Sequence, residues 1–185
     1  MNKTLKLTRK IQVRVDLPTA EERREAIGKL YHWQSCCYRT ANLMVSHLYT
    51  QEMISDFFYL TEGLRFKLWD EKKDPDGVLN TSRINTLYQV ASKRFKGKMP
   101  TNIITCLKGS LYSEFMRYRE DYRFGERSIP NFRKDMPFPF SRDEVRQFTQ
   151  KPEKKAFGFF LFGVPLHTYL GRDSSDKYHL LHRYA

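Results

Sequence analysis

The beginning of the chain alternates between apolar and polar residues, and this pattern limits the fold more than any other. From Thr4 to Asp16, five aliphatic residues (Leu5, Leu7, Ile11, Val13 and Val15) alternate with Lys, Thr, Gln and Arg. A period of two residues with one apolar face and one basic face predicts a half-buried β-strand. The alternation slips between Leu7 and Ile11, which predicts a bulge or bend near Arg9.

The period then changes to that of α-helices. Thr19 and Glu22, behind Pro18, have the spacing of a capping box that starts a helix. The stripe of a long helix follows at spacings of three and four, with most of it expected in the core: Ile27, Leu30, Gln34, Cys37, Ala41, Met44 and Leu48.

Three more helices are predicted in the same block, at Gln51–Leu60, at Thr81–Arg94 and from Pro100 onward. The turn formers of Lys72–Gly77 predict a loop between the first two. The inward-facing residues expected on the last two helices are Ile84, Leu87, Tyr88 and Ala91, then Ile104, Leu107, Leu111, Phe115 and Tyr118.

The helical pattern ends after Tyr122. Residues Phe124–Phe140 contain three prolines and a glycine, which predict an extended or looped segment. We refer to it as the return segment. Beyond it, two strands are predicted at Phe157–Leu170 and Lys177–Tyr184, joined as a hairpin by the polar turn Gly171–Asp176.

The opening strand is therefore separated from the later strands by about 110 residues of mostly helical sequence. This order predicts an α+β fold in which a small β-barrel of the oligonucleotide-binding type is interrupted by a helical domain. We expect residues 1–17 and 124–185 to form the barrel and residues 18–123 to form the insertion. Barrels of this type bind nucleic acids on their open face.

Charge indicates the class of partner. The chain carries 33 Lys and Arg against 21 Asp and Glu, a formal net charge of +12, and 15% of its residues are aromatic. A surplus of this size is most simply explained by a polyanion such as nucleic acid, because basic side chains bind phosphates. The alternative is a basic protein without a nucleic-acid partner.

Other classes fit poorly. The chain has too many apolar and aromatic residues for a disordered protein, no run that could span a membrane, and no secretory signal at the N-terminus. Its odd number of cysteines (Cys36, Cys37 and Cys106) contains no CxxC pair. This pattern predicts reduced thiols, a cytoplasmic location and no structural zinc site.

The return segment is the first candidate binding element. Arg127, Arg133 and Lys134 would reach phosphates, and Tyr122, Phe124 and Phe132 would stack on unpaired bases. The alternative is a linker strapped across the barrel. For Phe138 and Phe140, a place in the core is the favoured interpretation.

Two further groups come from the helical block. Arg119 and Arg123, four residues apart, share a helix face and either bind phosphate or pair with Glu120 and Asp121. Lys93–Lys98 is either a phosphate-binding helix end or a charged end favoured by the helix dipole. The candidate residues of the second group are Lys93, Arg94, Lys96 and Lys98. On the barrel, the candidates are Arg9, Lys10, Arg14 and Arg172.

Catalytic signatures are weak. Asp173 and Asp176 fall in a polar turn, where local hydrogen bonding explains Asp better than a metal does. His167 and His179 would come close on the predicted hairpin, but packing or base stacking is favoured over a metal pair. The sequence has no glycine-rich phosphate loop, GxSxG or HExxH motif, so we expect no catalytic residues and no cofactor.

Taken together, four segments of the chain resemble the N-terminal part of type V CRISPR effectors and their TnpB relatives. They are the opening strand Lys6–Val15, the helix start Met99–Ile103, the return sequence Gly125–Phe140, and Phe159–Leu170 followed by Gly171–Asp173. In that family a wedge barrel is interrupted by a helical recognition domain, and a RuvC-type nuclease follows. The resemblance covers almost the whole chain and is based on the element order and the short basic return loop.

The resemblance implies a prokaryotic or phage-encoded antiviral protein that binds guide RNA, and with it target DNA. It also implies that the chain ends at Ala185 before the nuclease carboxylates, so a nuclease chain or a second copy would complete it. Two other hypotheses stay open. One is a regulatory protein that mimics this region and binds the guide or a nuclease subunit. The other is an enzyme whose site involves Asp173 or Asp176.

Overall fold

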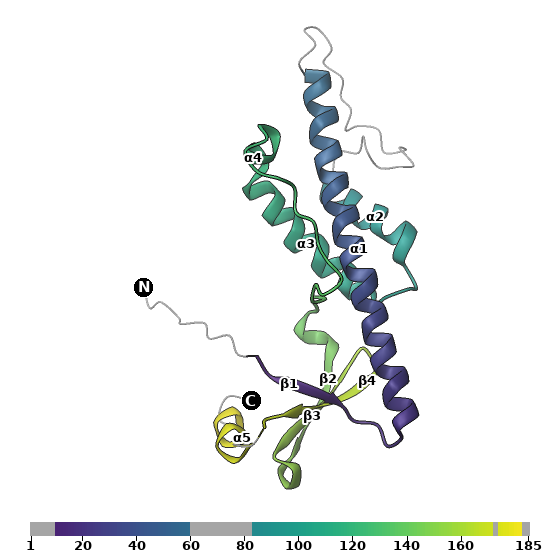
Figure 1. Ribbon diagram of the computed structural model, residues 1–185, viewed down its shortest axis with the longest axis vertical. Coiled ribbons are helices and arrows are strands. Elements are labelled where there is room, and N and C mark those ends of the chain that lie inside the picture. Colours follow the sequence, from purple (N-terminus) through teal and green to yellow (C-terminus); the bar gives the residue numbers. More distant parts are fainter. Residues whose placement is uncertain (1–9, 60–82, 172–173, 183–185) are drawn as a thin grey trace. The chain divides into compact units, whose positions relative to one another are not determined.

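The computed structural model describes residues 10–59, 83–171 and 174–182 (Figure 1). The described elements are, in order, β1 (Gln12–Val15), α1 (Ala20–Tyr59), α2 (Arg83–Phe95), α3 (Thr101–Arg117), α4 (Arg119–Arg123), β2 (Val145–Lys151), β3 (Ala156–Leu161), β4 (Val164–Tyr169) and α5 (Ser174–His182). Short 3₁₀ turns flank β2 at Arg142–Glu144 and Pro152–Lys154. The predicted α+β class is confirmed.

The chain divides into two compact units. Unit 1 comprises Met1–Gly28 and Arg142–Ala185, and unit 2 comprises Lys29–Ser141. These boundaries differ from the expected ones, because the return segment belongs to the helical unit and the first turns of α1 belong to the unit with the strands. The predicted bulge near Arg9, the loop Lys72–Gly77 and Arg172 lie outside the described residues.

Unit 1 is built on a four-stranded antiparallel sheet with the order β1-β4-β3-β2. β1 pairs with β4, so the first strand of the chain joins strands more than a hundred residues later, as the sequence predicted. Among the described residues the sheet is open, with β1 and β2 as its edges, and it is not a closed barrel.

One face of this sheet is apolar, and the other, here called the polar face, mixes polar side chains with Phe160, Pro165 and Tyr169. The register places Arg14, His167, Gly158 and Thr149 in one row across the four strands. The neighbouring rows on the opposite face supply the core of unit 1, since Phe157, Leu161, Val164 and Leu166 are buried. On the apolar side, Tyr178 of α5 stacks on Phe157 with ring centroids 4.9 Å apart.

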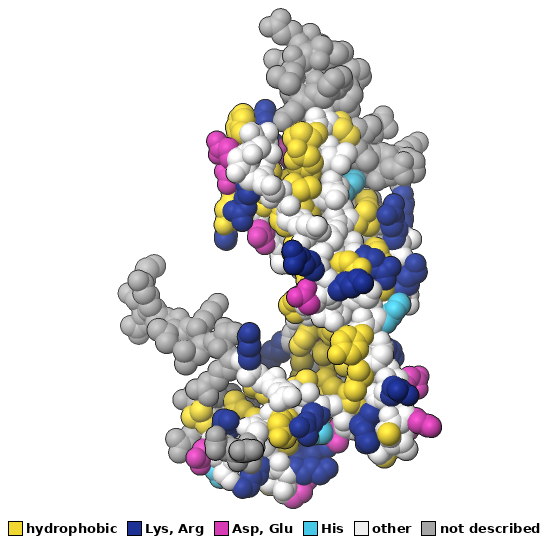
Figure 2. All heavy atoms as spheres, viewed as in Figure 1, with side chains coloured by type: hydrophobic (Ala, Val, Ile, Leu, Met, Phe, Trp, Pro, Cys, Tyr) yellow, Lys and Arg dark blue, Asp and Glu magenta, His cyan; other side chains and the backbone are white. Residues whose placement is uncertain are grey.

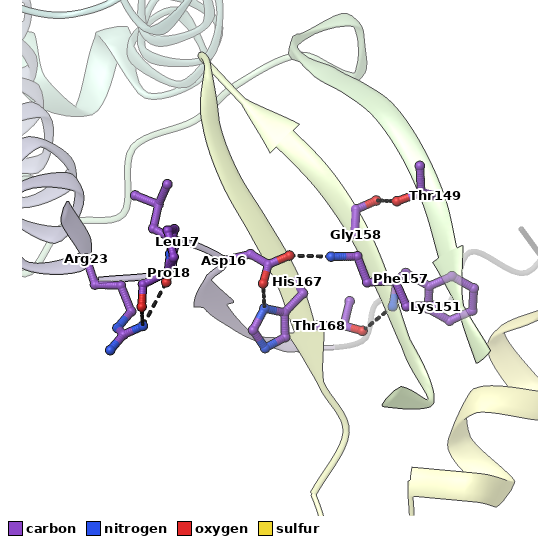
Figure 3. Close-up of polar contacts among 10 residues, drawn as sticks. All are labelled: Asp16, Leu17, Pro18, Arg23, Thr149, Lys151, Phe157, Gly158, His167 and Thr168. Atoms are coloured by element: carbon purple, nitrogen blue, oxygen red, sulfur yellow. Dashed lines mark hydrogen bonds and ion pairs between the residues drawn. The ribbon is translucent and has the colours of Figure 1, made fainter. Parts of the chain in front are cut away.

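A polar cluster joins the two edge strands across the polar face. Asp16, directly after β1, pairs with Lys151 at the end of β2 and lies 3.4 Å from Nδ1 of His167 in β4 (Figure 3). Edge strands three spacings apart would be about 14 Å apart in a flat sheet, so this contact requires the sheet to curl. A hydrogen bond from Lys151 holds the pKa of Asp16 below its ordinary value of 3.8.

Gly158 makes this contact sterically feasible. A Cβ at this position would lie 2.9 Å from Oγ1 of Thr149 and 3.0 Å from Cε of Lys151. The Lys151 stem therefore crosses β3 at the residue that has no side chain, which is a reason for a glycine inside a strand.

The predicted strands after the return segment need correction. Phe157–Leu170 is not one strand but most of two, β3 and β4, which pair as a hairpin through Phe162 and Gly163. Both turn residues have positive φ (50° and 81°), as a two-residue turn between twisted strands requires. The second predicted strand, Lys177–Tyr184, falls largely in the helix α5, and β2 was not predicted.

The start of α1 confirms the predicted capping box. The backbone N–H of Glu22 donates to Oγ1 of Thr19 at 3.2 Å, and that of Thr19 donates to Oε2 of Glu22 at 3.2 Å. Arg23 adds hydrogen bonds to the carbonyls of Leu17 and Pro18 (Figure 3). The two capping-box bonds satisfy backbone donors that the start of a helix leaves without a partner inside the helix.

Unit 2 consists of most of α1 with α2, α3 and α4 (Figure 1). The predicted helix at Gln51–Leu60 is not separate, because α1 runs unbroken to Tyr59. Most residues of the predicted apolar stripes are at least partly buried, but Ile27 is 42% exposed. The half-buried members are Leu30, Gln34, Ile84, Tyr88 and Tyr118. The fully buried members are Cys37, Ala41, Met44, Leu48, Leu87, Ala91, Ile104, Leu107, Leu111 and Phe115.

Candidate nucleic-acid interface

The strongest candidate surface is the turn that connects α2 to α3. Lys93, Arg94, Lys96 and Lys98 are all exposed. The turn is tight: the Lys98 N–H donates to the Phe95 carbonyl at 3.0 Å, and Gly97 has a φ of +81°, which favours glycine. We call this group of four cations the α2–α3 corner. Lys93 and Arg94 lie in the last turn of α2, and Lys96 and Lys98 lie on the hydrogen-bonded turn that follows it.

No carboxylate within the surrounding sequence offsets this charge. From Arg83 to Ser113 the chain contains six Lys or Arg residues and no Asp or Glu. Lys98 lies 6.0 Å from the ring centre of Phe95, and Lys108 of α3 lies 5.7 Å from that of Tyr88. Lys and Arg side chains are spread over the visible face in Figure 2. The corner is accordingly suited to a phosphate backbone.

A second candidate surface lies at the other end of α3, where the four arginines of residues 114–127 are matched by four acidic residues. This helix has 17 residues, so its ends are about 25 Å apart. Arg127 places its guanidinium 3.8 Å from the ring centre of Tyr118, and Phe124 is 69% exposed. Arg123 is exposed, lies 5.6 Å from the Phe124 ring and pairs with Glu120 at 3.8 Å. Phe124 is therefore the stacking candidate that remains accessible.

Two of the predicted binding residues have structural roles instead. Arg119 donates from Nε to Oε2 of Glu52 at 2.7 Å, and Arg83 pairs with the other oxygen of that carboxylate. Tyr122 is 2% exposed, with its ring stacked on Phe115 at 5.2 Å, and burial raises its pKa. A buried ring offers no face to a base, so Tyr122 is excluded as a stacking residue.

Glu52 is the centre of a buried ion cluster that the sequence did not reveal. Its carboxylate, 1% exposed, joins α1 to Arg83 of α2 and Arg119 of α4. Burial, and then the charge of Arg119, lowers the pKa of Arg83. A signal was present in the sequence, since Glu52 lies four residues after Leu48 and so continues the apolar stripe of α1.

The return segment is bound to the helices by two asparagines. Asn42 of α1 donates to the Phe132 carbonyl at 2.9 Å and accepts from its N–H at 2.8 Å. Asn102 of α3 donates to Oγ of Ser141 at 2.8 Å and accepts from its N–H at 3.0 Å. The segment thus runs back along the helices as a strap. Phe132 is half-buried in it.

The return segment exposes cations on one side and packs against α1 on the other. Arg133 and Lys134 are exposed. Phe138 is half-buried and meets Trp33 edge-on at 6.4 Å. Phe140 is 43% exposed, so its predicted place in the core is wrong. Prolines explain the extended course of the segment, and the predicted lack of helix and strand there is confirmed.

In unit 1, Lys10 and Arg14 are exposed. The Arg14 guanidinium lies 3.6 Å from the ring centre of Tyr169 on the neighbouring strand. Arg9 and Arg172 lie outside the described residues.

Within residues 10–59, 83–171 and 174–182, no group of three His, Cys, Asp or Glu side chains is arranged to hold a metal ion. Asp176 is exposed on α5, and Asp173 lies outside the description. The predicted hairpin of His167 and His179 is wrong, because His179 belongs to α5.

The cysteines are all free thiols. Cys36 and Cys37 are buried in α1, and burial raises the pKa of Cys37 to about 12. These two residues therefore fill the core of unit 2.

No helix in the described part of the chain is both long and apolar enough to span a bilayer. The chain matches no protein-family model, and a search among curated proteins found no match. Fold and site together therefore define a two-unit α+β protein with basic surfaces, and its resemblance to type V effectors stays a prediction.

Proposed function

We propose that this protein binds RNA through the helical unit, as the non-catalytic, guide-binding part of an RNA-guided DNA-targeting effector. The observation that carries the proposal is the α2–α3 corner: two exposed cations at the end of α2 and two on the hydrogen-bonded turn after it, inside a stretch of sequence without a carboxylate. Such a cluster gains affinity by releasing counterions from phosphates.

We favour RNA over regular double-stranded DNA as the ligand because aromatic side chains are exposed at the end of α3 that is far from the α2–α3 corner. Phe124 and the Arg127–Tyr118 stack offer flat surfaces to unpaired bases, which are common in structured RNA. Arg133 and Lys134 on the strap add cations. From the resemblance to type V effectors we propose that this RNA is a guide. The further partners would be the guide–target duplex and a RuvC-type nuclease chain.

The first test identifies the ligand. The tagged full chain is purified from its native host with moderate-salt washes, and the bound RNA is sequenced. One dominant structured RNA is expected. A broad mixture of ribosomal and transfer RNA would contradict guide binding, and co-migration with a nuclease chain without RNA would favour the regulatory hypothesis.

The second test locates the site. In the double variant Lys96→Gln, Lys98→Gln, affinity for the co-purified RNA should fall. The slope of log Kd against log salt should shrink by about 1.5, at roughly 0.7–0.9 per phosphate contact. The matched control removes two exposed cations of unit 1, Arg24→Gln and Lys154→Gln. Equal effects of the two double variants would mean that only net charge matters, and would refute a site at the corner.

A further inference from the structure

The two edges of the sheet in unit 1 differ in their regularity. All four residues of β1 pair one to one with residues of β4, without a shift in register. In β2 the register shifts between Arg146 and Thr149, and Gln147 has a φ of 51°. A bulge of this kind hinders the addition of a further strand. Among the described residues, β1 is therefore the edge better suited to accept one (Figure 1).

The backbone groups of Val13 and Val15 point away from the sheet. The Asp16 N–H donates to the Pro165 carbonyl at 2.9 Å, so the backbone of Asp16 faces β4. Successive residues of a strand direct their N–H and C=O groups to opposite sides, so those of Arg14 also face β4. Val13 and Val15 therefore direct theirs to the outer side, where no strand of the described part of the chain pairs with them.

The apolar side chains at this edge are incompletely covered. Val13 is 44% exposed and Ile11 is 43% exposed. The register puts Val13 on the sheet face opposite to Arg14, which is the apolar face on which α5 packs. A hollow of about 470 Å³ is lined by Ile11, by Leu170 at the end of β4 and by Leu181 of α5. Exposed aliphatic residues on an open edge favour pairing with another strand.

The charges around this hollow are positive. Lys10 and Lys177 are among its lining residues, and no Asp or Glu is. Lys177 donates from Nζ to the Leu170 carbonyl at 3.2 Å. A second copy of this chain would bring the same cations together, so a partner with acidic side chains is favoured. The ring of Tyr169 lies on the opposite face of the sheet, with Arg14 over it, so the hollow offers no ring to an RNA base.

We propose that β1 accepts an extended segment of a protein partner in which apolar and acidic residues alternate. The segment would bond to the outward backbone groups of Val13 and Val15. Its apolar side chains would cover Val13 and Ile11 beside the hollow, and its acidic side chains would lie on the face of Arg14. Strand addition of this kind gains affinity from backbone hydrogen bonds and selectivity from the side chains. The inference does not depend on RNA binding.

The test uses the full chain and a short dye-labelled peptide in which glutamate and valine alternate. Fluorescence anisotropy measures its binding, and NMR measures amide hydrogen exchange. The peptide should slow exchange at Val13 and Val15, whereas the amide of Arg14 should change little because it already faces β4.

The variant Val13→Pro removes one outward donor and leaves the pairing with β4 intact, and proline is tolerated at such a position of an edge strand. It should weaken peptide binding roughly three- to tenfold, the effect of one hydrogen bond. Val13→Ile keeps the N–H and the branched apolar shape. It is the matched control and should bind as the wild type does.

Two control peptides separate pairing from charge. One carries lysine in place of glutamate, and the other carries N-methyl groups on the amides of one edge; both should bind much more weakly. Equal binding of the N-methylated peptide would mean that net charge alone attracts the probe, and equal binding of the lysine peptide would mean that acidic residues are not recognised. Either result would overturn the inference. The variant Lys96→Gln, Lys98→Gln, which changes the α2–α3 corner, should bind the peptide as the wild type does.

Circular dichroism and thermal melting establish whether Val13→Pro is folded. If the folded variant binds the peptide as the wild type does, the edge site is refuted. It is also refuted if the amides of Val13 and Val15 gain no protection in the wild type, a measurement that holds even if the proline variant does not fold. An equal loss of affinity for the co-purified RNA in Val13→Pro would make this edge an RNA surface instead.

Discussion

Replacement of Glu52 by Gln is expected to destabilise unit 2 more than any other single loss of charge discussed above. The Glu52 carboxylate is 1% exposed and pairs with Arg83 and Arg119, whose side chains are 19% and 34% exposed. Without it, two guanidinium groups face each other beside the core. Removal of one partner of a buried ion pair costs about 3–5 kcal/mol.

The lower end of that range applies here, because Arg119 is about one-third exposed and water screens its charge. We therefore expect a loss of about 3 kcal/mol. For a unit of this size the melting temperature would fall by roughly 12 °C or more.

Hydrogen exchange at the amides of α1 and α2 assigns the loss to unit 2, since the chain has two units that need not unfold together. Glu114→Gln, at an exposed position on α3, is the matched control and should change stability by less than about 0.5 kcal/mol. The triple variant Glu52→Leu, Arg83→Met, Arg119→Leu should recover most of the loss, because it removes all three charges together. If Glu52→Gln is no worse than Glu114→Gln, the assigned role of this ion cluster is refuted.

Three further predictions concern the sheet and the strap. The folded-state pKa of Asp16 is lowered, so its carboxylate stabilises the folded state above the ordinary pKa of 3.8, and this stabilisation is lost as the pH falls through the folded-state pKa. In acid titrations of the wild type and Asp16→Asn, the difference between their free energies of unfolding should therefore vanish below the folded-state pKa of Asp16. Gly158→Ala should displace the Lys151 side chain, because the new Cβ would lie 2.9 Å from Oγ1 of Thr149 and 3.0 Å from Cε of Lys151. Since that stem is flexible and the pair with Asp16 is partly exposed, we expect a loss of no more than about 1 kcal/mol in urea unfolding; full additivity with Asp16→Asn in a double-mutant cycle would contradict the shared contact. Asn42→Ala leaves both backbone groups of Phe132 without their asparagine partner, so we expect a loss of about 2 kcal/mol and faster exchange of the Phe132 amide; unchanged exchange there would refute the role of the strap contact.

The elements that the sequence predicted well are those with a strong local signal. Thr19 and Glu22 have the spacing of a capping box, and their side chains make those bonds in the structure. The apolar positions of α3 repeat every three or four residues and are buried. Prolines keep the return segment out of helices and strands. In each case the physical cause lies within a few residues along the chain.

The candidate site was predicted in part. The corner cations are exposed as a surface site requires, while their apolar neighbours are not: Met99 is buried and Phe95 is half-buried. Arg119 and Tyr122 are different, because a buried carboxylate on α1 and an aromatic ring on α3 decide their roles. Glu52 is 67 residues from Arg119, and Phe115 is separated from Tyr122 by the break between α3 and α4, so the spacing of a single helix does not distinguish these residues from surface residues.

The sequence by itself determined the order of strand, helices and strands, the basic character of the surface, and the starts of the main helices, since these follow from local periodicity, composition and capping. The tertiary structure alone decided that the sheet is open with β2 at its edge, that α5 is a helix, and that Glu52, Asn42 and Gly158 organise contacts across the chain. These depend on which distant groups meet. The energy of a buried charge, of an unsatisfied amide or of a steric overlap is set by those neighbours and not by the adjacent residues.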